Sequence, residues 1–580
     1  MIISLRQKFS EPFFAADGPP RWPRTLTMSV LITLIAMLAA YGTLGNLTGY
    51  FFIRQDVLPG FLIIALSVYL SNRQNVANGS TNTDMTVPLP ALLLGGVALI
   101  LAGGWLGQST IMHGYNLSRD EQMAVQDAII FADGKFMFAL PPEWHELAAT
   151  LLRDFNSTMF RSDMTVSGYR PVNALAHAIM GTFGLMALTA PLFAALGLIA
   201  TWRVARRIWP EDAVPQAVAV LFYLCSSQMW AASMTTYAMS MLLGLNMIWL
   251  ALFLRRDWIG HLLTLPIGFL AVGIHQVPYH LMFVAPFIAM TVFDRRWRIA
   301  VLYGAAYAAF ALFWFRYEEI VSFVIGGAVL KASAPTVTGK IGGYFSAQPI
   351  TDRIAYSAAN LLRFLTWQHM LTLPLLFVGV RAAMRDRHWL LLAMGVACIL
   401  PLAIKFMQAP YQGHGWGYRY LHGAIGLSCI LAAAGWQELC RHRSARSGDL
   451  KLATAATLLI LMPWQFWHAS TFSGGYAEVD QRLKAIDSDI VIIDSRAANY
   501  ANDLVTNRPD LKNRPIRIVA DEVRARDIGK LCTMGSIALF PGSLLGPIQE
   551  LYREPAETSP EFHRITRQFQ VTCPSAMLVP

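Results

Sequence analysis

Charge is what this sequence has least of. Only 14% of its 580 residues are Asp, Glu, Lys or Arg and 55% are hydrophobic, whereas a soluble domain carries about 25% charged residues. Many apolar runs have about 17–25 residues, the length that crosses the hydrocarbon core of a bilayer. The shortage of charge therefore excludes an ordinary soluble domain and predicts an α-helical polytopic membrane protein.

Other sequence patterns are also missing, and each argues against a class of protein. No basic tract interleaved with aromatic residues accompanies the net charge of +10, so nucleic acid is not expected as a partner. No Gly-rich loop follows a strand and opens a helix, which argues against a nucleotide-binding fold. The chain has no evident internal repeat, and it lacks the inverted-repeat pattern of many transporters. No signal-peptide cleavage site precedes the first apolar run, so that run is expected to remain as an anchor.

Cysteine is scarce, and no pair of cysteines has the spacing of a metal site. Four of the six cysteines fall in or at the ends of apolar runs, where we expect them to pack as small hydrophobic residues. Cys532 and Cys573 lie in a polar tail and are able to pair if that tail is periplasmic.

Thirteen apolar runs are candidate membrane-spanning helices. They are residues 25–46, 57–71, 87–107, 172–201, 213–230, 233–254, 258–275, 277–294, 299–317, 361–382, 388–408, 419–440 and 450–469. With the N-terminus inside, arginine clusters fall on the inside loops, at 203–207, 255–256, 295–298, 381–387 and 441–446. Because Lys and Arg are enriched in cytoplasmic loops, this pattern predicts that residues 108–171, 318–360, 409–418 and 470–580 lie outside.

The chain is expected to divide into four segments. They are an N-terminal cytosolic segment with two extra spans (1–86), a catalytic module that includes the loop 108–171 (87–317), a second outside loop with the last spans (318–469) and a tail (470–580). In the tail, Asp489–Asp494, Ile516–Ala520 and Ile537–Phe540 are typical of short strands. We therefore expect a small α/β periplasmic domain at the C-terminus.

Two adjacent carboxylates, Asp120 and Glu121, stand in the first outside loop about ten residues after a predicted span. Adjacent carboxylates in a loop often form a solvated turn. In a partly desolvated site, however, one of them has a raised pKa and acts as a general base beside the other. The stretch from Gln122 to Ala132 has apolar residues at helical spacing, which predicts an amphipathic helix lying on the membrane surface.

This arrangement resembles the GT-C superfamily of membrane glycosyltransferases, which includes protein O-mannosyltransferases and the lipid A aminoarabinose transferase. The resemblance rests on the Asp120-Glu121 pair, the surface helix, Ala132–Lys135 and the Tyr169-Arg170-Pro171 segment, together with the order of spans over most of residues 87–440. It implies a catalytic acidic pair and a polyprenyl-phosphate sugar as the donor. It departs from the superfamily in having two extra spans before the module that begins at residue 87, and Arg170 where a Lys is usual.

Polar residues at membrane depth are the next candidates for substrate binding. Arg170 is either an interfacial anchor or a phosphate ligand. His275, Gln276, Tyr279 and His280 form either a satisfied interhelical hydrogen-bond group or contacts to the donor. His275 and Tyr279, four residues apart, share a helix face only if Pro278 does not break the helix. The two histidines have no evident third ligand with which to form a metal site. A divalent cation is left open as a cofactor.

Two later segments complete the candidate site. Lys331 and Lys340 lie in the second outside loop, as solvated charges or as ligands of the donor phosphate. The segment from His414 to Tyr420 contains Trp416, Tyr418 and Arg419, which are either ordinary interfacial residues or substrate contacts. Its two glycines are expected to allow the backbone to approach a ligand closely. Arg419 is the first choice for the phosphate of the carrier.

The sequence thus predicts an enzyme, an inverting glycosyltransferase of the bacterial inner membrane whose site faces the periplasm. Its partners would be the lipid bilayer, a polyprenyl-phosphate sugar as donor, and an envelope glycolipid, glycan or protein as acceptor. Two other classes stay open: a transporter or flippase of a lipid-linked sugar, which cleaves no bond, and a non-enzymatic scaffold with the tail as its working part.

Overall fold

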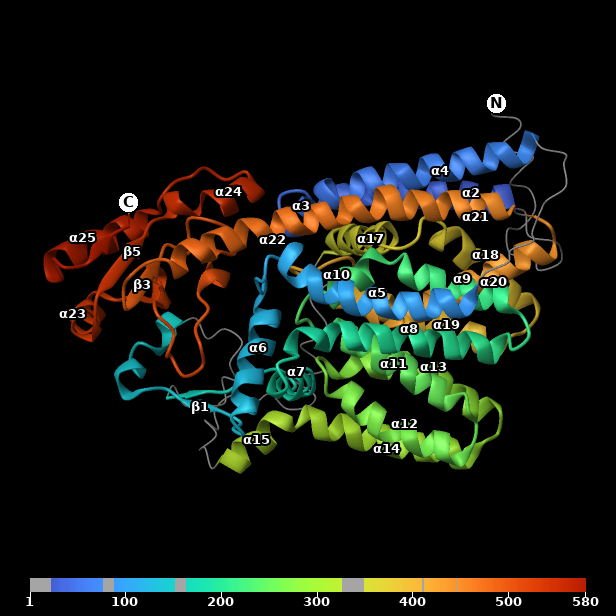
Figure 1. Cartoon of the computed structure of the whole chain (residues 1–580), viewed down its shortest axis with the longest axis horizontal. Helices are drawn as coiled ribbons and strands as arrows, with labels where there is room; N and C mark the ends of the chain where they lie inside the picture. Colours follow the sequence, from blue (N-terminus) through green and yellow to red (C-terminus); the bar gives the residue numbers. More distant parts are fainter. Residues whose placement is uncertain are drawn as a thin grey trace.

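The computed structural model describes residues 22–76, 88–151, 163–325, 349–408, 411–444 and 446–579. Long helices lie side by side in a bundle, and a short helix, α6 (Arg119–Ala132), runs across one end of it (Figure 1). A four-stranded sheet with its own helices lies beyond that end. The predicted helical class is therefore confirmed.

Seven helical stretches are long and apolar enough to cross a membrane by length and composition. They are Trp22–Thr43, Leu47–Arg73, Leu89–Thr110, Met186–Ile208, Trp297–Phe315, Trp389–Met407 and Arg419–Arg441. Four shorter apolar helices accompany them: α9 (Ala213–Leu224), α11 (Met239–Phe253), α12 (Trp258–Val272) and α13 (Val277–Phe293). These eleven stretches correspond to eleven of the predicted spans, and the count of thirteen stays a prediction.

Within the seven long stretches, the helices carry their own labels. They are α2 (Trp22–Ala40), α3 (Leu47–Phe51), α4 (Val57–Val76), α5 (Leu89–Thr110), α8 (Thr189–Ile208), α14 (Trp297–Phe315), α19 (Trp389–Met407) and α20 (Ile425–Arg441). A π-helical turn, η2 (Phe52–Asp56), joins α3 to α4, and a 3₁₀ turn, η6 (Arg419–Ala424), leads into α20.

Two predicted single spans are wrong. The run 172–201 is divided into α7 (Val172–Thr182) and α8, because Gly184 between them adopts a φ of 72°, which ends a helix. The run 361–382 is divided into α17 (Ile350–Thr366) and α18 (Thr372–Arg385). There the polar Gln368 donates to Gln228 Oε1 (3.1 Å), and the Trp367 carbonyl accepts from the Gln228 backbone N–H (3.3 Å). Hydrogen bonds to Gln228 of a neighbouring helix thus replace the backbone hydrogen bonds that a continuous helix would make here.

The last predicted span continues well past residue 469. Helix α21 (Ser447–Ala456) passes through a π-helical turn, η7 (Thr457–Leu461), into α22 (Met462–Lys484). This helix runs along the bundle and leads directly to the sheet in Figure 1. The remaining helices are α10 (Ser227–Ser233), α15 (Tyr317–Ile325), α23 (Ala525–Met534), α24 (Gly546–Tyr552) and α25 (Pro560–Thr572).

The three strands predicted in the tail are confirmed. They are β3 (Ile490–Ile493), β4 (Ile516–Val519) and β5 (Ile537–Phe540), and with β6 (Met577–Leu578) they form a parallel sheet in the order β4-β3-β5-β6. The first three are buried throughout, as expected for continuous apolar runs in a parallel sheet. A disulfide joins Cys532 to Cys573. A separate two-stranded ribbon pairs β1 (Phe138–Ala139) with β2 (Met164–Thr165).

Two glycines set the distance between α18 and α20. A Cβ atom at Gly435 would overlap the Leu375 carbonyl group, and one at Gly379 would overlap the Leu431 carbonyl oxygen. Small residues at such a crossing let two backbones pack closely inside a membrane.

We expect Gly435→Ala to destabilise the protein by about 1–3 kcal/mol, the cost of overpacking a fixed contact. Thermal unfolding of the purified protein in detergent micelles measures this loss. Gly304→Ala in α14 is the control, because nothing lies within 4 Å of its Cβ position, and alanine favours a helix by about 1 kcal/mol over glycine. Equal melting temperatures for both variants would contradict the packing argument.

Candidate functional site

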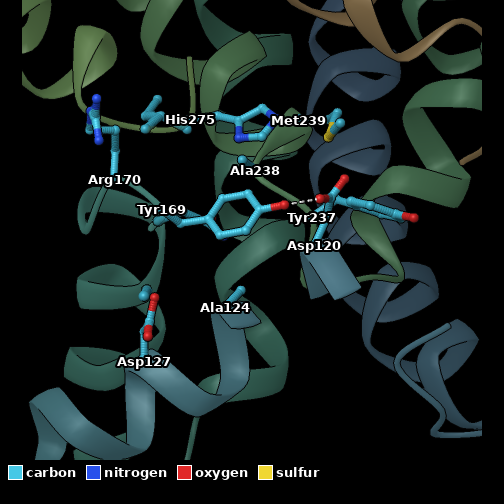
Figure 2. A pocket seen from close by; sticks show the side chains of 12 residues that line it. Asp120, Ala124, Asp127, Tyr169, Arg170, Tyr237, Ala238, Met239 and His275 are labelled. Atoms are coloured by element: carbon cyan, nitrogen blue, oxygen red, sulfur yellow. Dashed lines mark hydrogen bonds between the residues drawn. The ribbon is translucent and has the colours of Figure 1, made fainter. Parts of the chain in front are cut away.

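Asp120 lines a pocket at the end of the bundle where α6 crosses it. The pocket is lined by Asp120, Ala124, Asp127, Tyr169, Arg170, Asn173, Ala174, Tyr237, Ala238, Met239, Ile274 and His275. One carboxylate oxygen of Asp120 accepts a hydrogen bond from the Tyr169 hydroxyl (Figure 2), and the other accepts one from the Arg419 guanidinium. Both oxygens of this carboxylate are therefore engaged and oriented.

The local sequence explains why Asp120 faces the pocket and Glu121 does not. Ser118 has extended backbone dihedrals, so α6 begins at Arg119 and both acids fall in its first turn. The Glu121 carboxylate turns back and accepts the backbone N–H groups of Leu117 (3.1 Å) and Ser118 (3.4 Å). This is the capping role that Glu takes three residues after the N-cap. The structure thus places Glu121 in the helix start, and only Asp120 in the pocket.

The two acids differ in the direction of their pKa shifts. Burial by itself would raise the pKa of Asp120, but the Arg419 guanidinium, and next His275 and the Tyr169 hydroxyl, lower it below the usual value. Burial raises the pKa of Glu121 to about 8, with the backbone N–H of Ser118 opposing the rise and the charge on Asp120 adding to it. Asp120 is therefore the ionised carboxylate of the pair at neutral pH.

Arg419 reaches Asp120 from the loop before α20. Its guanidinium also donates to the Gln412 carbonyl and lies over the Tyr237 ring, 5.4 Å from the centroid. A Cβ atom at Gly415 would collide with the Arg419 side chain, and one at Gly417 would collide with Gln228. The expectation that these glycines approach a ligand is therefore corrected: they make room for protein side chains, and Gly415 in particular lets Arg419 fold back toward Asp120.

Arg170 lies on the opposite side of the pocket, where it forms an ion pair with Glu318 (3.4 Å). The Nε–H groups of both Arg170 and Arg419 are buried without an acceptor among the described residues. Buried N–H groups of guanidinium are costly to leave unpaired. Such groups on Arg170, which lines the pocket, and on Arg419, which pairs with Asp120, favour an anionic ligand here.

His275 also belongs to the pocket, although not as part of a helix. Helix α12 ends at Val272 and α13 begins at Val277, so His275 lies in the break, and Gln276 takes the N-cap position of α13. The His275 ring stacks on Tyr169, with 5.6 Å between centroids and 8° between planes. The condition for a shared helix face of His275 and Tyr279 is therefore not met, and the break lies before Val277 rather than at Pro278. Tyr279 instead stacks on Tyr420, beside Arg419, at 5.2 Å.

Of the predicted residues that the structure describes, Asp120, Arg170 and His275 line the pocket, and the others do not. His280 is fully buried and hydrogen-bonded to Asn246 (2.7 Å) and Tyr307 (2.9 Å), the satisfied interhelical arrangement. Trp416 packs between Trp367 and Phe472, and the Tyr418 carbonyl accepts from Gln228. His414 packs on Tyr500 of the tail. Lys331 and Lys340 lie outside the described residues.

The C-terminal tail packs directly against the helix that carries Asp120. Arg119 donates to the Val505 carbonyl (2.9 Å), and Gln122 donates to the Asp503 carbonyl (2.7 Å). His414 lies 3.7 Å from the Asp503 carboxylate, on the loop that carries Arg419. One short tail segment thus contacts both elements that supply the central ion pair.

Sequence reasoning missed Tyr169, Tyr237 and Asp127 as members of the site. Asp127 follows Asp120 by seven residues, which is two helical turns, so the spacing already placed both on one face of α6. Among the described residues, no group of three or more His, Cys, Asp or Glu side chains is arranged to hold a metal ion.

We expect Tyr169→Phe to lower turnover at this site about tenfold, because it removes one of the two groups that orient Asp120 while leaving the stack on His275. The measurement is the initial rate of the reaction proposed below. Tyr303→Phe is the control, since it removes an equally buried hydroxyl that bonds Thr264 and His261 outside the pocket. A loss of rate in both variants would mean that the effect is one of folding.

No family model matches this chain. No curated protein matches its sequence either. Among solved structures, the chain is similar to ArnT from Cupriavidus metallidurans bound to undecaprenyl phosphate, with 14% identity and a TM-score of 0.43, over 85% of this chain and 90% of that chain. It is similar to the apo state of the same protein with 14% identity and a TM-score of 0.42, over the same shares of the two chains.

Proposed function

We propose that this protein is an inverting membrane glycosyltransferase that moves a sugar from a polyprenyl-phosphate carrier to an acceptor at the outer face of the membrane. The observation that carries the proposal is the ion pair of Arg419 with Asp120, in the wall of a pocket that Asp120 and Arg170 line. A carboxylate suits the removal of a proton from the acceptor. Two arginines with free buried N–H groups suit a phosphate that gains charge as it leaves.

The reaction then follows in one displacement. Asp120 takes the proton of the acceptor hydroxyl, and the acceptor oxygen attacks the anomeric carbon of the sugar. The bond from that carbon to the phosphate oxygen breaks, and the phosphate leaves with the electron pair and its lipid. Arg419 and Arg170 stabilise the negative charge on the departing phosphate, and His275 and Tyr169 form the wall beside the sugar.

The pocket is proposed to face the periplasm. The loops that leave α8, α11, α13, α18 and α20 carry the arginine clusters, and a positively charged loop favours the cytoplasmic side. Helix α6 lies in the loop 108–171, which the predicted topology places on the opposite side of the membrane from these arginine clusters. The disulfide between Cys532 and Cys573 also agrees with a tail in an oxidising compartment.

Mass spectrometry of envelope glycolipids and glycans, from cells with and without the gene, tests the function. The expected result is that one sugar modification disappears and returns with the wild-type gene, but not with Asp120→Asn. An envelope with every modification intact would overturn the proposal. A lipid-linked sugar that accumulates on the inner side while Asp120→Asn complements fully would favour the transporter.

A further inference from the structure

A second pocket adjoins the one around Asp120. It is lined by Asp127, Phe131, Phe136, Val166, Ser167, Tyr169, Tyr317, Glu318 and Val321. Asp127 and Tyr169 line both pockets. The two spaces therefore share a wall, and a ligand in the second pocket would meet the first one at these two side chains.

Asp127 is a buried carboxylate without an ion pair among the described residues. Asp127 is only 3% exposed. Its carboxylate is hydrogen-bonded to the Ser167 side chain, and the Ser167 hydroxyl oxygen also accepts a hydrogen bond from the Tyr169 backbone N–H (3.0 Å). Arg170 is turned to Glu318 instead. A buried carboxylate that lacks a cation costs stability, so its presence at a pocket wall indicates a ligand that supplies hydrogen-bond donors.

The walls of the second pocket indicate what kind of ligand that is. Phe131 and Phe136 meet edge to face, with 6.4 Å between centroids, and Tyr317 lies across from them on α15. Aromatic faces beside carboxylates suit a ring with both apolar C–H faces and hydroxyl groups. A phosphate fits poorly, because the unpaired Asp127 carboxylate would repel it and no arginine among the described residues belongs to this lining.

We propose that the second pocket is the acceptor subsite, that it binds an uncharged sugar ring, and that Asp127 accepts hydrogen bonds from that ring's hydroxyl groups. This inference rests on the proposed function and narrows the acceptor to a carbohydrate hydroxyl. The ring is held so that one further hydroxyl points past Tyr169 to Asp120, where it loses its proton. Asp127 is thus an acceptor-binding residue, and Asp120 remains the base.

Binding to the purified full-length protein in detergent micelles tests the subsite without requiring transfer. The probes are the methyl glycosides of glucose, galactose, mannose and N-acetylglucosamine, with glucose 1-phosphate as the charged counterpart, followed by saturation-transfer NMR. We expect at least one methyl glycoside to bind, and Asp127→Asn to weaken it about tenfold, the effect of losing hydrogen bonds to a charged group. Phe136→Ala is a second variant that should weaken the same probe.

Asp133→Asn is the matched control, because it makes the same chemical change at the exposed end of α6, where Asp133 pairs with Lys135 (3.6 Å). It should bind like the wild type. Sugar transfer is measured separately from binding, which separates this inference from the proposed function. If Asp120→Asn transfers sugar normally while Asp127→Asn loses binding, the function fails and the subsite stands. Equal binding by Asp127→Asn, tighter binding of glucose 1-phosphate, or no binding of any methyl glycoside would each overturn the subsite.

The pH dependence adds an independent readout. Burial raises the pKa of Asp127 to about 7, with the Ser167 hydroxyl opposing the rise, so the charged acceptor form exists above neutral pH and is lost below it. Wild-type affinity should therefore increase from pH 5.5 to pH 8.5, and that of Asp127→Asn should stay constant. The other titratable groups that face the two pockets are Asp120, Tyr169, Arg170, Tyr237, His275, Tyr317 and Glu318. Because Asn removes a buried charge, this variant should also melt no lower than the wild type at pH 8.5.

Discussion

Replacing Asp120 by Asn should reduce sugar transfer by roughly 10²–10⁴-fold, the usual contribution of a positioned general base. The amide keeps the shape of the carboxylate and still meets the Tyr169 hydroxyl, but it cannot take a proton. The measurement is the initial rate of formation of the sugar-modified product, once the comparison of envelopes has identified it. The pH profile of the residual activity should no longer depend on this carboxylate.

Glu121→Gln is the control for that result. Glutamine retains an oxygen that accepts the backbone N–H groups of Leu117 and Ser118, so the start of α6 should persist. We expect transfer within about threefold of the wild type, a difference of less than 1 kcal/mol in the barrier. The opposite ranking, with Glu121→Gln inactive and Asp120→Asn active, would exchange the roles of the two acids.

Replacing Arg419 by Lys should lower transfer by about 10²–10³-fold, the cost of removing one group that stabilises charge in a transition state. Lysine keeps the positive charge but lacks the planar fork, so it cannot hold Asp120 and a phosphate at once. Undecaprenyl phosphate binding, followed by native mass spectrometry, should weaken in parallel. Activity equal to that of the wild type would show that charge alone suffices at this position.

The pair Asp120 and Arg419 offers a test that separates folding from chemistry. Asp120→Asn leaves the buried Arg419 charge without its partner, which costs about 3–5 kcal/mol when a buried pair is broken. Asp120→Asn combined with Arg419→Gln removes both charges and should recover much of the melting temperature. Activity should stay lost in the double variant. Recovered activity together with recovered stability would mean that the pair serves only the fold.

Several features of the protein follow from local sequence. The helix predicted over Gln122–Ala132 follows from its apolar spacing, and the structure extends it back to Arg119. The tail strands follow from short runs of branched apolar residues, each buried on both faces. These features depend on neighbours within a few residues, and so the sequence alone was sufficient to predict them.

The division of the long runs could not be obtained in this way. Gly184 and the polar pair Gln368-His369 look unremarkable inside apolar sequence, yet helices end beside them. Whether a polar residue breaks a helix or merely faces a partner depends on what the neighbouring helix offers. For His280 the partners are Asn246 and Tyr307, 34 and 27 residues away in sequence, so its structural role is decided by packing.

The sequence by itself determined that this chain is built for a membrane, that an acidic pair in an outside loop precedes an amphipathic helix, and that an arginine stands at the start of a late span. Only the tertiary structure decided which of the two acids lines the pocket and which arginine pairs with it. Adjacent residues on a helix point about 100° apart, so when Glu121 closes the helix start, Asp120 is turned toward the bundle. Its arginine partner lies 299 residues further along the chain, and contacts of that range are set by how the helices pack.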